Sequence, residues 1–149
     1  MTPEPSPILE GVSETSSGVA ILVWRRDPEL EVLLLHRRQF GRSFEGDWAW
    51  TTPGGGREQG EQPAATAARE LFEETGLRLR IVPVSSRIAD EQPGINVDLF
   101  TAEASVDDRV CLSDEHDRFE WVKPGELDRC LPTWVAEMYR ESLETLPSR

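Results

Sequence analysis

Three glutamates near the middle of the chain have the spacing of a metal-binding cluster. Glu70, Glu73 and Glu74 lie three and four residues apart, and positions so spaced share one face of an α-helix. Carboxylates held this close repel one another, so the cluster becomes favourable when it holds a hard divalent cation such as Mg²⁺. The three side chains are therefore candidate metal ligands. The alternative is an acidic helix face that is only solvated.

Local signals mark the helix that would carry these glutamates. Pro63 suits the first helical turn, and Gly76 suits the left-handed position that follows a helix. Alanines, with Leu71 and Phe72, supply helix propensity and an apolar face. Just before the helix, residues 53–56 read Pro-Gly-Gly-Gly. Such a turn lets the backbone come close to a ligand or to the helix itself.

The stretch from residue 55 to residue 77 resembles the Nudix box. That pattern is Gly, five residues, Glu, seven residues, then Arg-Glu-apolar-x-Glu-Glu-x-Gly-apolar, and every specified position is matched here. Leu71 and Leu77 fill the apolar positions, and Trp50 precedes the glycines at the usual offset. The resemblance implies one Nudix hydrolase domain over residues 17–149, with an α/β/α sandwich around a mixed central sheet.

The resemblance also implies roles for single residues. A Nudix hydrolase cleaves a nucleoside diphosphate linked to a second group X, using Mg²⁺ or Mn²⁺. Glu73 or Glu74 would contact the catalytic water, Arg69 would orient the ligands, and the carbonyl of Gly55 would be an extra metal ligand. Glu61 has two readings, a water-bridged metal contact or a charge at the helix terminus.

A second acidic segment adds a catalytic candidate outside the box. Ser113-Asp114-Glu115-His116, followed by Trp121, resembles a segment of Nudix members that act on dinucleoside polyphosphates and on some nucleoside triphosphates. In that pattern the glutamate approaches the metals from a loop, so Glu115 is an auxiliary catalytic candidate. The alternative is an acidic surface turn, and we interpret His116 as a structural hydrogen bonder.

Positive and aromatic residues lie in the segment that leads into the box. Arg37, Arg38 and Arg42 are candidate substrate-binding residues that would contact phosphates; the alternative is ordinary surface charge. We expect Trp50 to lie in the core. Trp48 is equivocal between the core and a surface on which a base could stack.

The remaining pattern indicates the α/β class. Apolar or alternating runs suit strands, and an apolar side with Val135, Met138, Tyr139 and Leu146 suits a final helix capped by Thr133. Strands before, between and after two helices favour a mixed sheet with helices on both faces. The expected strands are residues 18–24, 31–36, 47–52, 77–84, 87–90, 96–104 and 119–122.

Composition excludes several partners. The 149 residues carry a formal charge of −12, which argues against binding a nucleic acid polymer or an anionic membrane. Apolar runs are too short for a transmembrane span, and the first residues lack a secretory signal.

Cys111 and Cys130 form no disulfide framework, so we expect reduced, buried thiols in a cytoplasmic protein. Residues 1–16 suit a flexible tail, and monomer and homodimer stay open.

The Nudix resemblance implies a Mg²⁺-dependent pyrophosphohydrolase, and the resemblance of residues 113–121 favours a dinucleoside polyphosphate or a (d)NTP as its substrate. The arginines favour long phosphate chains, which carry more negative charge. One alternative is an ADP-ribose or sugar-nucleotide pyrophosphatase. The other is a non-catalytic Nudix module that binds nucleotides, which the intact glutamates and Arg69 disfavour.

Overall fold

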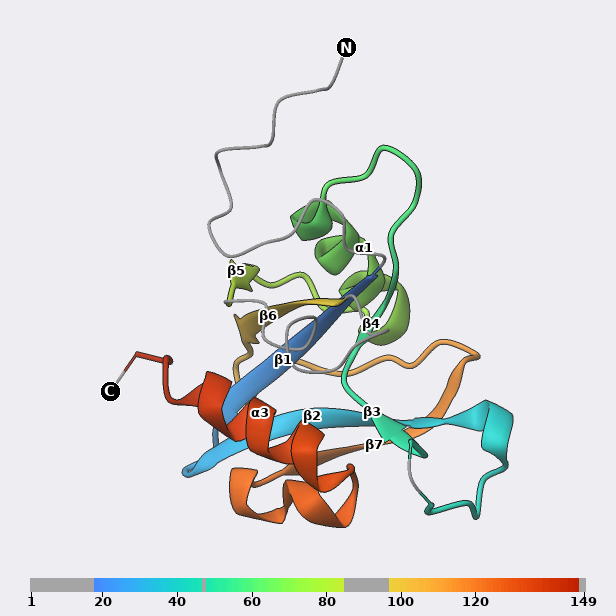
Figure 1. Ribbon diagram of the computed structural model, residues 1–149, viewed down its shortest axis with the longest axis vertical. Coiled ribbons are helices and arrows are strands. Elements are labelled where there is room, and N and C mark those ends of the chain that lie inside the picture. Colours follow the sequence, from blue (N-terminus) through green and yellow to red (C-terminus); the bar gives the residue numbers. More distant parts are fainter. Residues whose placement is uncertain (1–17, 47, 85–96, 148–149) are drawn as a thin grey trace.

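The protein folds around a mixed β-sheet with a helix on each face (Figure 1). The computed structural model describes residues 18–46, 48–84 and 97–147. Within these residues the sheet has seven strands, and the predicted α/β class is confirmed. The tail at residues 1–16 and the strand expected at 87–90 lie outside the described residues. No described helix is long and apolar enough to cross a membrane.

Strand β1 (Gly18–Arg26) is the centre of the sheet. It pairs antiparallel with β2 (Leu30–Arg37) on one side, as the predicted hairpin requires, and parallel with β6 (Val97–Glu103) on the other. Ile21 and Leu22 are fully buried although they point to opposite faces of the sheet. This burial on both faces explains the continuous apolar run.

The other strands are short or lie at the edges. They are β3 (Trp50–Thr51) and β7 (His116–Val122), which both pair with β2, β4 (Gly54–Gly56), which pairs with β1, and β5 (Val82–Pro83), which pairs with β6. Two 3₁₀ turns, η1 (Arg38–Phe40) and η2 (Pro124–Arg129), follow β2 and β7.

The two helices bury different faces of β1. Helix α1 (Pro63–Thr75) packs Ala67 and Leu71 into the core that contains Ile21. Helix α3 (Thr133–Leu143) packs Ala136, among others, into the core that contains Leu22. Figure 1 shows the two helices apart, with the sheet between them. The predicted limits of α1 are confirmed, and Gly76 ends it with a left-handed φ of 75°.

Two of the expected elements are wrong in detail. Only Val82 and Pro83 of the segment 77–84 join the sheet. Leu77, Leu79 and Ile81 instead pack against the α1 core without a ladder, and Arg78 stacks on Phe72 of α1, 4.0 Å from its ring centroid. The alternation of apolar and charged residues in this segment therefore arises because one side packs on the core and the other faces solvent, not because residues 77–81 pair with a strand. The expected strand 47–52 is likewise reduced to β3.

Two single-residue expectations also need correction. Pro132, not Thr133, occupies the N-cap position of α3, and no side chain caps that helix. Cys111 is exposed and Cys130 is only partly buried, whereas both were expected to be buried; the backbone N–H of Cys111 donates to the carbonyl of Thr75 at 2.7 Å. Trp50 is buried, as expected, with 3% of its surface exposed.

The close contact of β4 with β1 predicts a strong effect at Gly54. An added Cβ would lie 2.2 Å from the carbonyl oxygen of Val19, so Gly54→Ala must displace backbone. We expect the free energy of unfolding to fall by about 2 kcal/mol or more, the scale of a severe steric change. Gly125→Ala is the matched control, since nothing lies within 4 Å of its Cβ position. Denaturant unfolding compares the two, and equal stabilities would contradict the prediction.

Candidate active site

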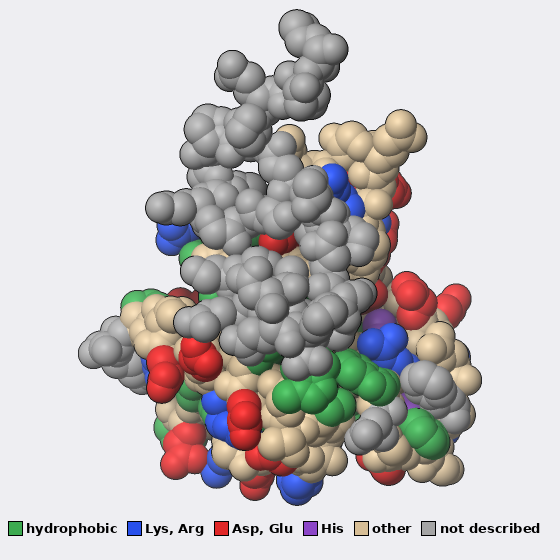
Figure 2. All heavy atoms as spheres, viewed as in Figure 1, with side chains coloured by type: hydrophobic (Ala, Val, Ile, Leu, Met, Phe, Trp, Pro, Cys, Tyr) green, Lys and Arg blue, Asp and Glu red, His purple; other side chains and the backbone are tan. Residues whose placement is uncertain are grey.

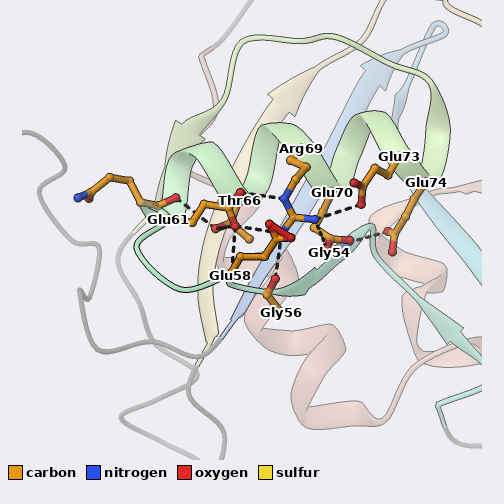
Figure 3. Close-up of polar contacts among 10 residues, drawn as sticks. Gly54, Gly56, Glu58, Glu61, Thr66, Arg69, Glu70, Glu73 and Glu74 are labelled. Carbon is orange, nitrogen blue, oxygen red and sulfur yellow. Dashed lines mark hydrogen bonds and ion pairs between the residues drawn. The ribbon is translucent and has the colours of Figure 1, made fainter.

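One arginine on α1 connects most of the polar residues of the box (Figure 3). The Nε and Nη2 of Arg69 donate to the two carboxylate oxygens of Glu61 at 2.8 and 2.9 Å. Its Nη1 donates to Glu70 at 2.9 Å and to Glu73 at 3.1 Å, and its Nη2 also donates to the carbonyl of Gly56 at 3.1 Å. One guanidinium therefore joins the loop before α1, strand β4 and the helix itself.

Glu61 is held by contacts within the protein. Besides Arg69, it accepts hydrogen bonds from the Thr66 hydroxyl at 2.8 Å and from the Glu58 backbone N–H at 3.1 Å. Arg69 above all, and then the Glu58 N–H, lower the pKa of Glu61 to about 2. The sequence left Glu61 open between a metal contact and a helix-terminus charge; its contacts are those of a partner that fixes Arg69.

Glu74 is the buried member of the cluster, with 4% of its surface exposed. Its Oε1 accepts a hydrogen bond from the N–H of Gly54 at 2.9 Å. Burial raises the pKa of Glu74 to about 8, and the negative charges of Glu70 and Glu115 add to this, against the opposing effects of the Gly54 N–H and Arg37. A carboxylate in this position lacks a cation strong enough to offset its burial.

Glu70 lies directly over the glycine turn. A Cβ added to Gly55 would lie 2.5 Å from the carboxylate carbon of Glu70, so a side chain at this position would displace that carboxylate. Burial raises the pKa of Glu70, and Arg69 opposes that shift. The carbonyl oxygen of Gly55 faces β1, because a Cβ on Gly18 would lie 2.8 Å from it.

Glu115 approaches the α1 glutamates from the turn before β7. Its negative charge contributes to raising the pKa of both Glu70 and Glu74, so the three carboxylates are within electrostatic range. Its carbonyl accepts a hydrogen bond from the N–H of Arg38 at 3.0 Å, and its own N–H donates to the Ser113 hydroxyl at 3.4 Å. The fold thus joins two segments that are far apart in the sequence.

The three candidate arginines separate in space. Arg37 is half-buried and lines a cavity of about 360 Å³ together with Glu74 and Glu115. Its Nε is buried and has no hydrogen-bond partner within the described part of the chain. Arg37 and Arg38 also line an adjacent cavity of about 300 Å³. Arg42 is exposed and lines neither of these cavities, so it is the weakest of the three candidates.

The larger cavity has an apolar wall that sequence reasoning did not connect with the site. Helix α3 contributes Trp134, Val135 and Tyr139, and Trp48 lies on the loop before β3. The sequence pattern places Val135 and Tyr139 on the apolar side of a helix and gives no signal for Trp134. No local pattern shows that α3 lines the same cavity as the glycine turn, because that arrangement depends on how the helix packs across the sheet.

Comparison with known proteins identifies the family. The family model of the NUDIX domain matches residues 16–146. The chain belongs to the Nudix family. An octanoyltransferase of Myxococcus xanthus is 40% identical over 111 residues, which are 70% of this chain and 30% of that protein. An RNA pyrophosphohydrolase of Roseobacter denitrificans is 47% identical over 45 residues, which are 30% of this chain and 28% of that protein. The chain thus spans about 30% of these relatives' length.

Solved structures share the fold. An Ap4A hydrolase of C. elegans in a binary complex has a TM-score of 0.63 at 21% identity, covering 83% of this chain and 93% of that one. A MutT protein from Methanosarcina mazei has a TM-score of 0.60 at 24% identity, covering 88% and 96%. These likenesses confirm the predicted Nudix architecture.

The donor set of the Nudix box suits a hard divalent cation, although its side chains do not yet converge on one. Over residues 18–46, 48–84 and 97–147, no group of three His, Cys, Asp or Glu side chains is already arranged to hold a metal ion. Arg69 engages Glu70 and Glu73, and the Gly54 N–H engages Glu74. The donors are nevertheless all carboxylate oxygens, and the burial that raises the pKa of Glu74 disfavours its anion, which a bound cation would favour.

Two histidines lie at this end of the Nudix sheet. His116 is buried, and its Nδ1 has no hydrogen-bond partner in the described structure. Burial, together with the positive charge of Arg37, lowers the pKa of His116 to about 4. His36 is fully buried, with Nδ1 2.8 Å from Asp117 and Nε2 donating to the carbonyl of Phe44 at 2.6 Å. The His36 contacts, unforeseen from the sequence, fix the loop that carries Trp48.

The raised pKa of Glu74 predicts that the metal-free domain loses stability as pH rises. Between pH 6.5 and 8 the native state keeps a proton on Glu74 that the unfolded chain has released, so the free energy of unfolding falls. Below pH 6.5 the lowered pKa of His116 acts in the opposite direction. We expect Glu74→Gln to remove most of the fall above pH 6.5.

Urea unfolding in EDTA at several pH values measures this effect. Glu137→Gln, an exposed change on α3, is the control and should leave the pH dependence unchanged. A flat profile in the unsubstituted protein would show that Glu74 is ionised throughout this range.

Proposed function

We propose that this Nudix domain hydrolyses a phosphoric anhydride in a nucleoside diphosphate linked to a second group. The observation that carries the proposal is the position of Glu74, Glu115 and Arg37 around one cavity, with Glu70 within electrostatic range of both glutamates. Carboxylates suit a cation, and the arginine suits phosphate oxygens. The names of several relatives, among them RNA pyrophosphohydrolase and diphosphoinositol polyphosphate phosphohydrolase 2 of Rattus norvegicus, support this class of reaction.

Glu70, Glu73 and Glu74 are the residues that would hold Mg²⁺ or Mn²⁺. The Gly55 carbonyl, the extra ligand expected from the sequence, faces β1 and is the weakest donor of the set. A cation bound there supplies neutralisation of phosphate charge and a lower pKa for a bound water. Arg69 positions the glutamates, since it contacts Glu70 and Glu73 directly.

A carboxylate that does not bind the cation is the best candidate to accept a proton. Glu115 faces the α1 glutamates from a separate turn, so it can accept the proton of the attacking water while the box glutamates bind the cation. Glu73 and Glu74 are the alternative contacts of that water. Because hydrolysis of an anhydride needs little covalent chemistry from the protein, catalysis rests on positioning and charge stabilisation.

A long phosphate chain is the substrate that the basic residues favour. Arg37 and Arg38 line adjoining cavities beside Glu115, and more phosphates present more oxygens to them. We therefore propose a dinucleoside polyphosphate or a (d)NTP rather than ADP-ribose.

The formal charge of −12 disfavours a nucleic acid polymer as substrate. The octanoyltransferase match covers 30% of that protein, and nothing in the site assigns acyl transfer to this chain.

The metal assignment predicts loss of turnover without loss of folding. Glu70→Gln and Glu74→Gln keep side-chain size but remove charge, so each should lower kcat by ~10²-fold or more, the scale of one electrostatic catalytic group. EDTA should abolish turnover, and Mg²⁺ should restore it. Glu137→Gln, exposed on α3, should be unaffected. Near-normal turnover in Glu70→Gln, Glu73→Gln and Glu74→Gln alike would refute the assignment.

The substrate assignment predicts a higher kcat/KM for diadenosine tetraphosphate or ATP than for ADP-ribose. Arg37→Ala should lower the ratio of the kcat/KM for the long-chain substrate to the kcat/KM for ADP-ribose about tenfold, since a charged hydrogen bond contributes roughly 1.5–3 kcal/mol. Arg42→Ala should have a smaller effect because its side chain lines neither cavity. Arg129→Ala, exposed on η2, is the control. Steady-state kinetics at one Mg²⁺ concentration make the comparison, and a preference for ADP-ribose would overturn the assignment while leaving anhydride hydrolysis in place.

A further inference from the structure

Trp48 is an exposed aromatic residue held in an unfavourable backbone conformation. Its φ is 69°, the one positive φ of a non-glycine residue in the described part of the chain. A bulky side chain rarely adopts this conformation, and glycine would adopt it without strain. The indole is 42% exposed, so burial in the core does not compensate for the strain. A tryptophan at this position therefore calls for an explanation other than packing.

The ring of Trp48 is positioned by a second tryptophan from a distant part of the chain. Its centroid lies 6.2 Å from that of Trp134 on α3, with the ring planes at 66°. In an edge-to-face pair, one of the two rings meets the other only with its edge, so neither face of that ring is covered by the pair. A flat ligand could therefore still stack on an indole face. Trp134 is partly buried against the α3 core, which gives Trp48 a fixed neighbour.

Both tryptophans line the same cavity as the candidate catalytic carboxylates. The cavity of about 360 Å³ extends from Trp48 and Trp134 to Glu74, Glu115 and Gly54. Figure 2 shows hydrophobic side chains gathered on this face beside basic and histidine side chains. Apolar and charged groups thus occupy one continuous surface, which suits a ligand with a flat apolar part joined to an anionic part.

We propose that Trp48 and Trp134 form the surface on which the nucleobase of the substrate stacks while its phosphates lie at the carboxylate end. The assignment rests on the proposed function for the position of the phosphates. Every base has a π face, so stacking on indole tolerates different bases. The tryptophans would therefore set the preference for nucleotides over other polyphosphates, rather than the choice among bases.

The test measures binding without turnover. The four ribonucleoside 5′-monophosphates contain no phosphoric anhydride, and ribose 5-phosphate is the matched probe that lacks the base. Calorimetric titration in Mg²⁺ gives Kd for each. We expect the unsubstituted protein to bind at least the purine monophosphates more tightly than ribose 5-phosphate.

Substitutions of Trp48 separate base binding from folding. Trp48→Gly and Trp48→Ala should both weaken purine monophosphate binding about tenfold or more, the scale of one lost stack. Neither should change the Kd of ribose 5-phosphate. Trp48→Gly should be the more stable of the two, because only glycine relieves the positive φ. Trp48→Phe should restore part of the affinity.

A second variant and a control complete the design. Trp134→Leu keeps apolar bulk against the α3 core and should also weaken binding of the base. Phe119→Ala, which removes an aromatic ring that is 41% exposed on β7, should not. Unchanged Kd values in Trp48→Gly and Trp134→Leu, or equal losses for ribose 5-phosphate, would overturn the proposal, as would an unsubstituted protein that binds monophosphates no better than ribose 5-phosphate.

Turnover distinguishes this proposal from the proposed function. If the protein hydrolyses ATP or diadenosine tetraphosphate but the tryptophan variants bind purine monophosphates normally, the stacking surface is wrong and the hydrolase stands. If purine monophosphates bind through Trp48 and Trp134 and no anhydride is cleaved, the stacking surface stands, and the protein is a nucleotide-binding Nudix module.

Discussion

The ion pair between Arg69 and Glu61 is the contact on which the arrangement of the site depends. Partly exposed ion pairs contribute little to stability one by one, and Arg69 is about a quarter exposed. Its effect is geometric. Two parallel hydrogen bonds to Glu61 fix the plane of the guanidinium, and that plane sets where Nη1 meets Glu70 and Glu73. A lysine could neutralise the same charge but could not hold two partners in a fixed plane.

The glycine turn fixes the distance between the helix and the sheet. Gly54 lies against the backbone of Val19 at a separation that excludes a Cβ, and Gly55 lies under the carboxylate of Glu70. Because β4 pairs with β1 at these residues, the central strand also helps to set how far the α1 glutamates lie from the sheet. The hydrogen bond from the Gly54 N–H to Glu74 then connects that strand pair directly to the buried carboxylate.

Local signals made part of this arrangement predictable. Proline and glycine fix where α1 begins and ends, so the helix was predicted with its correct limits. The approach of Glu115 rested on resemblance alone, because nothing in residues 113–116 says which helix they face. Spacing could not separate Arg37 from Arg42, since Arg37 ends β2 whereas Arg42 lies in the following loop, whose path depends on the buried His36 contacts. Trp134 joined the cavity only through the packing of α3 across the sheet.

The charges of the site explain why its own arginines cannot replace a cation. Arg69 is engaged by Glu61, Glu70 and Glu73, so none of its hydrogen bonds goes to Glu74. Arg37 is near enough to lower the pKa of Glu74, but burial outweighs it and the value stays at about 8. A polyphosphate entering this cavity adds further negative charge. Under the proposed function, positive charge that enters with the substrate would offset this repulsion, which is the physical reason for proposing a divalent cation beside the nucleotide.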